Sequence, residues 1–197
     1  AGAEGGSAAA GLAGAGYGGA AGYGDEVFNA TNARTLLNSL TAFGPRVTGS
    51  HANEVLVPAF LQKHLKALQR SLPKGTGESG NVGNVGDVGD VGVGDWSVLV
   101  NAHFDSIPGS PGGADDGVGV ACMLEVLRVL TLGPPLTRPV LFLFNGAEES
   151  NHQAAHGFVT QHPWAQSVQY VLNLEAIGSG GQELVFQCNS GWLAKFY

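Results

Sequence analysis

Side chains of the kinds that bind metals follow three apolar segments of this 197-residue chain, at the points where those segments end. They lie in the stretches "NAHFDS", "NGAEES" and "NLEA" and are His103, Asp105, Glu148, Glu149 and Glu175. Several carboxylates gathered in one place repel each other unless a cation is present, and a divalent ion is the simplest compensation. Imidazole together with carboxylate favours zinc over magnesium or calcium. The residue types therefore predict a zinc site, provided that the three segments converge.

A fourth acidic group, "GGADDGVG", places Asp115 and Asp116 at the start of a predicted helix. A carboxylate here could bridge two ions about 3.5–4 Å apart, the spacing of two-metal hydrolases. Acidic residues before a helix also serve as ordinary caps, and we interpret Asp116 as a charge that complements the helix dipole. For Asp115, the three other groups favour a ligand role over capping. In the first group, Asp105 can accept the second ring N–H of His103, which fixes the tautomer of that imidazole.

Helices and strands alternate in the predicted secondary structure that positions these groups. Apolar residues at helical spacing predict helices over residues 28–40, 57–72, 115–130 and 151–161 and at the C-terminal end of the chain. Apolar runs predict strands over residues 96–102, 139–144, 168–174 and 183–188. Because the strands are apolar on both faces, the pattern is typical of an α/β fold, a three-layer α/β/α sandwich with a mostly parallel (mixed) central sheet. Ligands bind outside the carboxyl ends of strands in such sheets, so we expect the four groups to converge on one cleft.

Two segments of biased composition set the domain organisation. Residues 1–24 are almost entirely Gly, Ala and Ser and are predicted to be disordered. A Gly/Val/Asp-rich stretch at residues 73–95 is predicted to be a flexible insertion within one domain over residues 25–197. The formal net charge of -7 and the lack of a basic patch argue against a nucleic-acid partner. The sequence contains no run of about 18 apolar residues, so no membrane span is predicted within it.

Several residues outside the acidic groups have ordinary explanations. Cys122 and Cys188 lie in apolar stretches, so we interpret them as two buried thiols rather than a disulfide. His152 and His156 have the four-residue spacing of a helical zinc pair. Because no glutamate follows His152, we expect a surface histidine and a packed histidine instead. Asn29 begins the triplet "NAT", which is either a glycosylation sequon or a helix N-cap.

The stretches "FGPRVTGS", "HFDS", "PGGADDGVG", "NGAEES", "QHPW" and "NLEA" resemble, in this order and spacing, the family-28 zinc exopeptidases. Each stretch is weak evidence alone, and their combination is specific. The resemblance covers about residues 26–197 apart from the insertion. It implies a partial zinc peptidase domain of the zinc-exopeptidase fold, truncated at its C-terminus. The implied activity is that of an aminopeptidase-like metallopeptidase, which hydrolyses peptide or protein substrates with a water activated by two zinc ions.

The resemblance also implies a metal-binding role for four residues. His103 and Glu175 are the implied ligands of one zinc ion, although most relatives have Asp where this chain has Glu175. Asp115 is the implied bridge between the two ions. Glu149 is the implied ligand of the second zinc ion. The implied cofactor is therefore Zn²⁺, with two ions in an intact domain.

The implied catalytic residues are Glu148 and Asp105. Glu148 would be the general base that takes a proton from the attacking water and delivers it to the leaving amine, and Asp105 would orient His103. The family supplies a further histidine to the Glu149 zinc from far downstream, but no histidine follows His162 here. We therefore expect the chain to be a fragment that holds the Glu149 zinc poorly and lacks peptidase activity by itself.

Two other functions remain open. Acyl transfer of the glutaminyl-cyclase type uses the same fold, and a non-catalytic binding scaffold would keep the fold without its ligands. The presence of all five implied ligand and base residues argues against the scaffold: His103, Asp115, Glu148, Glu149 and Glu175. The resemblance is to an endoplasmic reticulum branch of the family. It implies an endoplasmic reticulum membrane protein with this domain in the lumen and membrane-spanning segments outside the chain.

Overall fold

The computed structural model describes residues 11–15, 27–71, 96–133, 136–176, 181 and 184–195. Within them, one four-stranded sheet has the spatial order β1-β3-β2-β4. Its strands are β1 (Gly11–Ala15), β2 (Ser97–His103), β3 (Val140–Asn145) and β4 (Val168–Asn173). β2 runs parallel to both β3 and β4, whereas β1 runs antiparallel to β3. The sheet is therefore mixed and mostly parallel, as the alternating pattern predicted.

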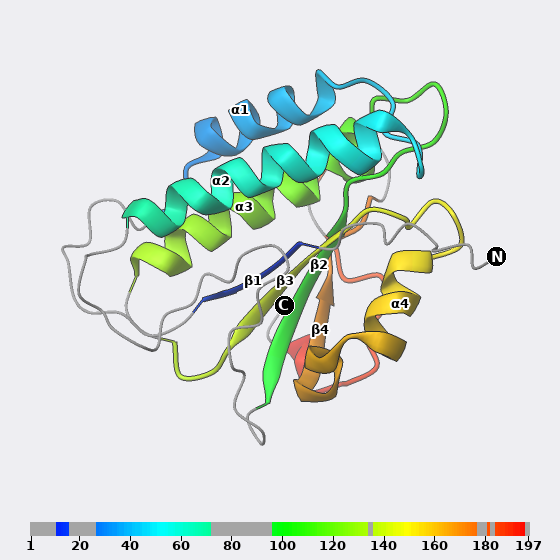
Figure 1. Ribbon diagram of the computed structural model, residues 1–197. Helices are drawn as coiled ribbons and strands as arrows, with labels where there is room; N and C mark the ends of the chain where they lie inside the picture. The colour runs from blue at the N-terminus through cyan, green and yellow to red at the C-terminus, as the bar shows by residue number, and fades with distance from the viewer. Residues whose placement is uncertain are drawn as a thin grey trace.

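Helices cover both faces of this sheet (Figure 1). α1 (Ala30–Thr41), α2 (Val57–Ser71) and α3 (Val118–Leu132) lie together over one face, and α4 (Gln153–Gln161) packs against the other. Four short helical turns complete the described elements: η1 (Ala52–Leu56), η2 (Gly113–Gly117), η3 (Pro163–Ser167) and η4 (Leu193–Lys195). The predicted three-layer sandwich is confirmed.

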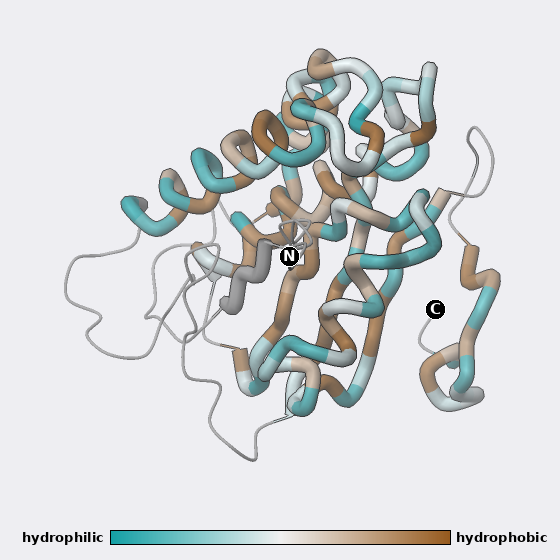
Figure 2. Tube along the Cα trace, turned by 45° about the vertical axis from the view of Figure 1, so that its right-hand side comes forward, coloured by the Kyte–Doolittle hydropathy of each residue, from teal (hydrophilic) through white to brown (hydrophobic). Residues whose placement is uncertain are grey.

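β3 shows why the sheet is covered on both sides. Successive side chains of a strand point to opposite faces. Phe142 and Phe144 lie in the larger core with α1, α2 and α3, whereas Leu141 and Leu143 pack with Phe158 of α4. Figure 2 shows hydrophobic residues along the central strands and on the helix faces turned toward them. Because full burial of each such side chain contributes about 1.5–3 kcal/mol, β3 is stabilised by the helices on both faces of the sheet.

β4 is more exposed than the sequence predicted. Residues 169–173 are exposed, and Val171 and Leu172 keep 61% and 55% of their surface accessible. The prediction of a further strand over residues 183–188 is wrong, since residues 184–188 have no regular structure, and only the turn η4 forms near the C-terminal end. A strand needs a neighbour that completes its backbone hydrogen bonds, and within the described sheet residues 184–188 have none.

Two further predictions change in the less regular regions. The prediction of disorder for residues 1–24 is wrong at Gly11–Ala15, because the free edge of β3 pairs with their backbone. The rest of that segment and the predicted insertion at residues 73–95 lie outside the described residues. Cys122 and Cys188 are not joined in a disulfide, as predicted, but Cys122 is only partly buried and Cys188 is exposed. Cys188 lies at the end of the predicted strand over residues 183–188, which does not form.

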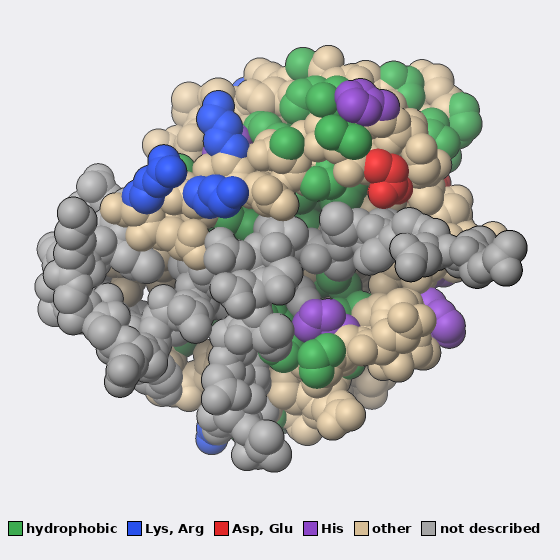
Figure 3. Space-filling model, in the orientation of Figure 1, with side chains coloured by type: hydrophobic (Ala, Val, Ile, Leu, Met, Phe, Trp, Pro, Cys, Tyr) green, Lys and Arg blue, Asp and Glu red, His purple; other side chains and the backbone are tan. Residues whose placement is uncertain are grey.

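Lys and Arg side chains on the face shown in Figure 3 gather over the C-terminal half of α2. Arg70 lies in the last turn of that helix. Basic side chains near a helix C-terminus complement the negative end of the helix dipole. These basic side chains therefore have an ordinary helix-stabilising explanation.

A buried carboxylate fastens α1 to α3. Glu125 on α3 is fully buried and accepts hydrogen bonds from the backbone N–H of Asn29, at 2.8 Å, and from the side-chain amide of Asn32. Arg128 donates to both carboxylate oxygens. Burial opposes ionisation, but these hydrogen bonds outweigh it and lower the pKa of Glu125. Asn29 is also the N-cap of α1, because its side chain accepts the Asn32 N–H at 3.0 Å.

We predict that Glu125→Gln lowers the free energy of unfolding by about 1.5–3 kcal/mol at pH 7, the range for hydrogen bonds to charged groups. A carboxylate whose pKa is lowered by folding stabilises the fold above its unfolded pKa and loses that contribution as the pH falls through its folded pKa. The difference between variant and wild type should therefore shrink below about pH 4.3, the unfolded value for Glu. Urea unfolding at neutral and acidic pH measures this difference in the free energy of unfolding. Glu54→Gln is the control, because Glu54 lies outside this hydrogen-bond network. An equal difference at both pH values would contradict the prediction.

Candidate metal centre

β2 ends at His103, and the imidazole of this residue is buried at the carboxyl edge of the sheet. Its Nδ1 forms a 3.1 Å hydrogen bond with the backbone carbonyl oxygen of Asp105. A carbonyl oxygen only accepts, so Nδ1 carries a hydrogen, and Nε2 presents a lone pair once the ring has lost its second proton. Nε2 is buried and has no hydrogen-bond partner within the described part of the chain. A buried ring nitrogen with a free lone pair is suited to metal binding.

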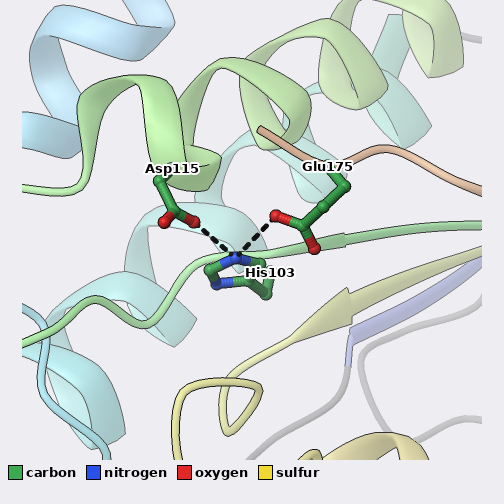
Figure 4. A group of neighbouring side chains, drawn as sticks. All are labelled: His103, Asp115 and Glu175. Atoms are coloured by element: carbon green, nitrogen blue, oxygen red, sulfur yellow. Dashed lines mark ion pairs between the residues drawn. The ribbon is translucent and has the colours of Figure 1, made fainter. Parts of the chain in front are cut away.

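Two carboxylates from other segments face this nitrogen (Figure 4). Oδ1 of Asp115 lies 2.9 Å and Oε1 of Glu175 lies 3.6 Å from His103 Nε2. Asp115 belongs to η2 and Glu175 follows β4, so the three side chains come from three elements. Ligands about 2.0–2.2 Å from one zinc ion are about 3–3.6 Å apart, close to these separations. All three ligand atoms lie within 4.8 Å of one another, and the set fits a divalent cation of the zinc type.

The charges around His103 agree with this geometry. Burial of the imidazole opposes its protonation, but the hydrogen bond to Asp105 and the negative charges of two further carboxylates, Asp116 and Glu175, outweigh it. Together these effects raise the pKa of His103 to about 9. The carboxylates thus favour a positive charge at this position, and a divalent cation would supply one.

Asp105 connects the histidine to the two glutamates. Its buried Oδ1 lies 3.4 Å from His103 Nδ1 and accepts the backbone N–H of Glu148 at 3.0 Å. Its Oδ2 accepts the backbone N–H of Glu149 at 2.9 Å and the hydroxyl of Thr48 at 3.1 Å. Burial opposes ionisation, but the hydrogen bonds from His103 and from the two amides lower the pKa of Asp105. The sequence predicted only the contact with His103, because no local pattern shows which backbone amides a distant strand will supply.

The adjacent glutamates after β3 differ in their surroundings. The Glu148 side chain is 21% exposed, and its Oε2 lies 4.0 Å from His103 Nε2. The structure does not bring Glu149 into the group of three converging ligand atoms. Burial and, next, the charge of Asp115 raise the pKa of Glu149, which shows that its carboxylate lies in the field of the same site. Of the predicted residues, three therefore meet at one point, with Glu148 beside them.

Asp116 has the predicted position at the start of α3 and a second contact that the sequence did not reveal. Its Oδ1 accepts the backbone N–H of Gly119 at 3.2 Å in the first turn of the helix. Its Oδ2 accepts the backbone N–H of His103 at 3.3 Å. Burial raises the pKa of this carboxyl, the charge of His103 opposes the rise and that of Glu175 adds to it, which gives a pKa of about 7. Asp116 therefore ties the helix start to the end of β2.

His152 and His156 do not form a helical pair. His152 is the residue before α4, with a left-handed backbone at φ 55, and its exposed ring places Nδ1 2.8 Å from Glu148 Oε1. The prediction that His156 is packed is wrong, because its position on α4 faces away from the core and is exposed. The contact with Glu148 was missed in the sequence, although a four-residue spacing between opposite charges was present as a signal.

The sequence profile of Peptidase family M28 matches residues 88–195, more than half of the chain. The chain belongs to peptidase family M28. This assignment confirms the predicted resemblance. Members of M28 are peptidases, enzymes that hydrolyse peptide bonds, and the matched region contains all the residues of the candidate metal centre.

Curated relatives of this M28 chain carry the name endoplasmic reticulum metallopeptidase 1. The chain is 41% identical over 196 residues to the Mus musculus protein and 43% identical over 205 residues to the Homo sapiens protein. The alignments cover 86% and 91% of the chain but 22% and 23% of the relatives, so the chain spans less than a quarter of their length. Within the described residues, no helix combines the length and apolar character that crossing a membrane requires.

Solved structures show that the M28 chain has the fold of zinc-dependent exopeptidases. LapB from Legionella pneumophila matches with a TM-score of 0.60 at 23% identity, over 77% of this chain and 44% of that one. A glutaminyl cyclase from Porphyromonas gingivalis matches with a TM-score of 0.57 at 18% identity, over 78% and 61%. A Zn-dependent exopeptidase from Parabacteroides distasonis matches with a TM-score of 0.53 at 19% identity, over 78% and 63%. At such identities the likeness concerns the fold alone.

Proposed function

We propose that this chain carries zinc ligands and the general base of a metallopeptidase that acts as an aminopeptidase-like exopeptidase on peptides or proteins. The observation that carries the proposal is the convergence of His103, Asp115 and Glu175 around a buried imidazole nitrogen without a hydrogen-bond partner. Membership of a peptidase family supports the same reaction class. The metallopeptidase relatives agree with a donor set that fits zinc.

In this proposal, four residues hold two ions. His103 and Glu175 would bind one zinc ion, Asp115 would bridge it to a second, and Glu149 would bind the second. The rise in the pKa of Glu149, caused by burial and then by the charge of Asp115, supports the neighbourhood of these two carboxylates. When bound, zinc supplies Lewis acidity that polarises the peptide carbonyl and promotes ionisation of the attacking water.

Glu148 is the proposed general base. Its carboxylate faces the ligand nitrogen of His103, with Oε2 4.0 Å from Nε2, and its backbone N–H is held by Asp105 at 3.0 Å. From this position Glu148 accepts a proton from the attacking water and delivers it to the leaving amine. The backbone N–H of its neighbour Glu149 donates to the other carboxylate oxygen of Asp105. Asp105 therefore fixes the backbone of both glutamates, while their side chains have different proposed roles.

We predict that Asp105→Asn weakens zinc binding about 10–100-fold, the usual effect of changing a residue that orients metal ligands. The amide keeps the shape of the side chain but has only one acceptor oxygen for the N–H groups of Glu148 and Glu149. Calorimetric zinc titration of variant and wild type measures the change. Thr48→Ala is the matched comparison, since it removes a single hydrogen bond to Asp105 and should have a smaller effect. Equal zinc affinity in wild type and Asp105→Asn would exclude the orienting role.

The proposed location is the endoplasmic reticulum membrane, with the peptidase domain in the lumen. The names of the relatives support the compartment. Membrane attachment would come through segments outside this chain. Protease protection of the tagged natural protein in sealed microsomes tests the lumenal orientation.

Zinc stoichiometry combined with peptide hydrolysis tests the proposed function. The assay uses this chain and the longest natural protein that contains it. Two zinc ions with release of N-terminal amino acids support the exopeptidase. One zinc ion with cyclisation of N-terminal glutamine would replace the proposal by acyl transfer. Absence of zinc binding in both proteins would reduce the domain to a scaffold.

A further inference from the structure

We propose that Arg46 is a positioning residue for the metal centre, and this inference rests on the proposed zinc site. Arg46 lies in the stretch "FGPRVTGS", which supplies none of the candidate ligands. We infer that its side chain holds His103 and Asp115 at ligand separation by binding both ends of the loop between them. This loop, residues 104–112, leaves β2 directly after His103 and leads into η2, which contains Asp115.

The guanidinium of Arg46 is fully buried and donates to carbonyl groups at the two ends of this loop. Nε donates to the carbonyl oxygen of Phe104 at 2.6 Å, at the first end. Nη2 donates to the carbonyl oxygen of Gly112 at 2.9 Å, and Nη1 donates to that of Pro111, at the second end. Another bond from Nη1, to Gly44 at 3.3 Å, ties the side chain to its own turn. One rigid planar group therefore spans the whole loop.

The backbone of Arg46 fixes the middle of the same loop. Its N–H donates to the Ser106 hydroxyl oxygen at 2.9 Å, and its carbonyl accepts the Ser106 N–H at 3.2 Å. The Ser106 hydroxyl donates in turn to the carbonyl of Ser110 at 2.8 Å. Arg46 forms no close ion pair among the described residues, and its buried charge is compensated by carbonyl oxygens and by the nearby negative charge of Asp105. A buried charge is costly unless its donors are satisfied, which makes the loop conformation and the arginine mutually dependent.

Gly112 transmits this constraint toward Asp115. A Cβ at Gly112 would lie 2.6 Å from Arg46 Nη2 and 2.8 Å from the Asp115 carbonyl oxygen, and its φ of +55 favours glycine. The carbonyl of Gly112, the residue before η2, also accepts the N–H of Gly117, the last residue of that turn, at 3.0 Å. Arg46 thus sets the position of the turn that carries Asp115, while its bond to Phe104 sets the end of β2. The 2.9 Å separation of His103 Nε2 and Asp115 Oδ1 follows from these two constraints, one on the end of β2 and one on the turn η2.

The test replaces the planar fork and keeps the charge. In Arg46→Lys, a single ammonium group cannot reach both ends of the loop. Zinc affinity should fall about 10–100-fold, as for other residues that orient metal ligands. The absorption spectrum of bound Co²⁺, which reports ligand geometry, should change as well. Arg34→Lys is the matched control, because it exchanges an exposed arginine on α1. Near-ultraviolet circular dichroism confirms that each 197-residue variant is folded.

The outcomes separate this inference from the zinc site itself. Failure of the wild-type chain to bind zinc would overturn the site. Normal zinc binding by wild type together with unchanged affinity and cobalt spectrum in Arg46→Lys would overturn the positioning role alone, even if the variant is less heat-stable. If Arg46→Lys does not fold, the zinc affinity of Gly112→Ala tests the positioning role instead. This variant retains the arginine, but its added Cβ pushes the loop away from the guanidinium. Unchanged zinc affinity in Gly112→Ala would count against the proposal, and a decrease supports it.

Discussion

Replacement of His103 by alanine is expected to abolish zinc binding at the described site and to lower kcat/KM for peptide hydrolysis about a thousandfold. Lewis-acid catalysis contributes several kcal/mol, and each ~1.4 kcal/mol corresponds to a tenfold change in rate. His103 supplies the single nitrogen of the three converging ligand atoms, and its Nε2 lies within 2.9 and 3.6 Å of the two carboxylates. Without it, Asp115 and Glu175 face each other with uncompensated charge. Zinc content and peptide hydrolysis of the natural protein measure the effect.

The control for this variant is a histidine outside the site. His156→Ala exchanges an exposed histidine of α4 and should retain both zinc and activity. Because His103 is buried, circular dichroism must show that His103→Ala is folded before its zinc content is interpreted. A folded His103→Ala variant with the zinc content of wild type would refute the proposed ligand set.

Glu148→Gln should lower kcat about 10²–10⁴-fold while zinc binding stays close to that of wild type. The amide retains the size of the side chain and the backbone hydrogen bond to Asp105, but it cannot accept the proton of the attacking water. Glu148 also lies farther from His103 Nε2 than either converging carboxylate, at 4.0 Å, which separates its role from that of a ligand. Steady-state kinetics and zinc titration of the same preparation provide both readouts.

Two results would contradict the assignment of Glu148. Loss of zinc together with activity would make it a ligand, and retention of kcat would exclude it as the general base. Glu54→Gln is a suitable control, because it removes a carboxylate of η1 without touching the site. Glu148→Asp gives a further check, since a shortened carboxylate should keep part of the activity that the amide loses.

The fold was predictable where it depends on local patterns. Apolar runs predicted β2, β3 and β4 to within a residue or two at either end. For β2 and β3 the reason is that a strand buried on both faces needs a continuous apolar sequence. The same pattern failed at residues 184–188, where an apolar run lies exposed and without strand pairing. It also missed β1, whose Gly- and Ala-rich sequence pairs through the backbone. Strand pairing depends on a neighbouring edge, and a chain segment does not reveal whether that edge is free.

In the candidate site, too, some features were predictable from the sequence and others were not. Residue types at the strand ends and at one helix start were enough to predict a zinc site, and the family resemblance implied that His103 and Glu175 bind one ion and that Asp115 bridges it to a second. The structure brings the ligand atoms of these three residues together. The nomination of Glu149 for a second ion stays a prediction. No local pattern pointed to the hydrogen bonds that the amides after β3 donate to Asp105, or to those that the guanidinium of Arg46 donates to the loop before η2.

The sequence by itself determined the α/β alternation, the strand ends and the kinds of ligand placed there, because these follow from hydrophobic periodicity and side-chain chemistry along short stretches. Only the tertiary structure decided that β4 lies beside β2, which brings Glu175 to within 3.6 Å of His103 Nε2 across 72 positions of sequence. It alone decided that the imidazole is buried and that Nε2 has no hydrogen-bond partner among the described residues. These features arise from packing and hydrogen bonds between distant segments, whose free energies exist only once the sheet and its helices have assembled.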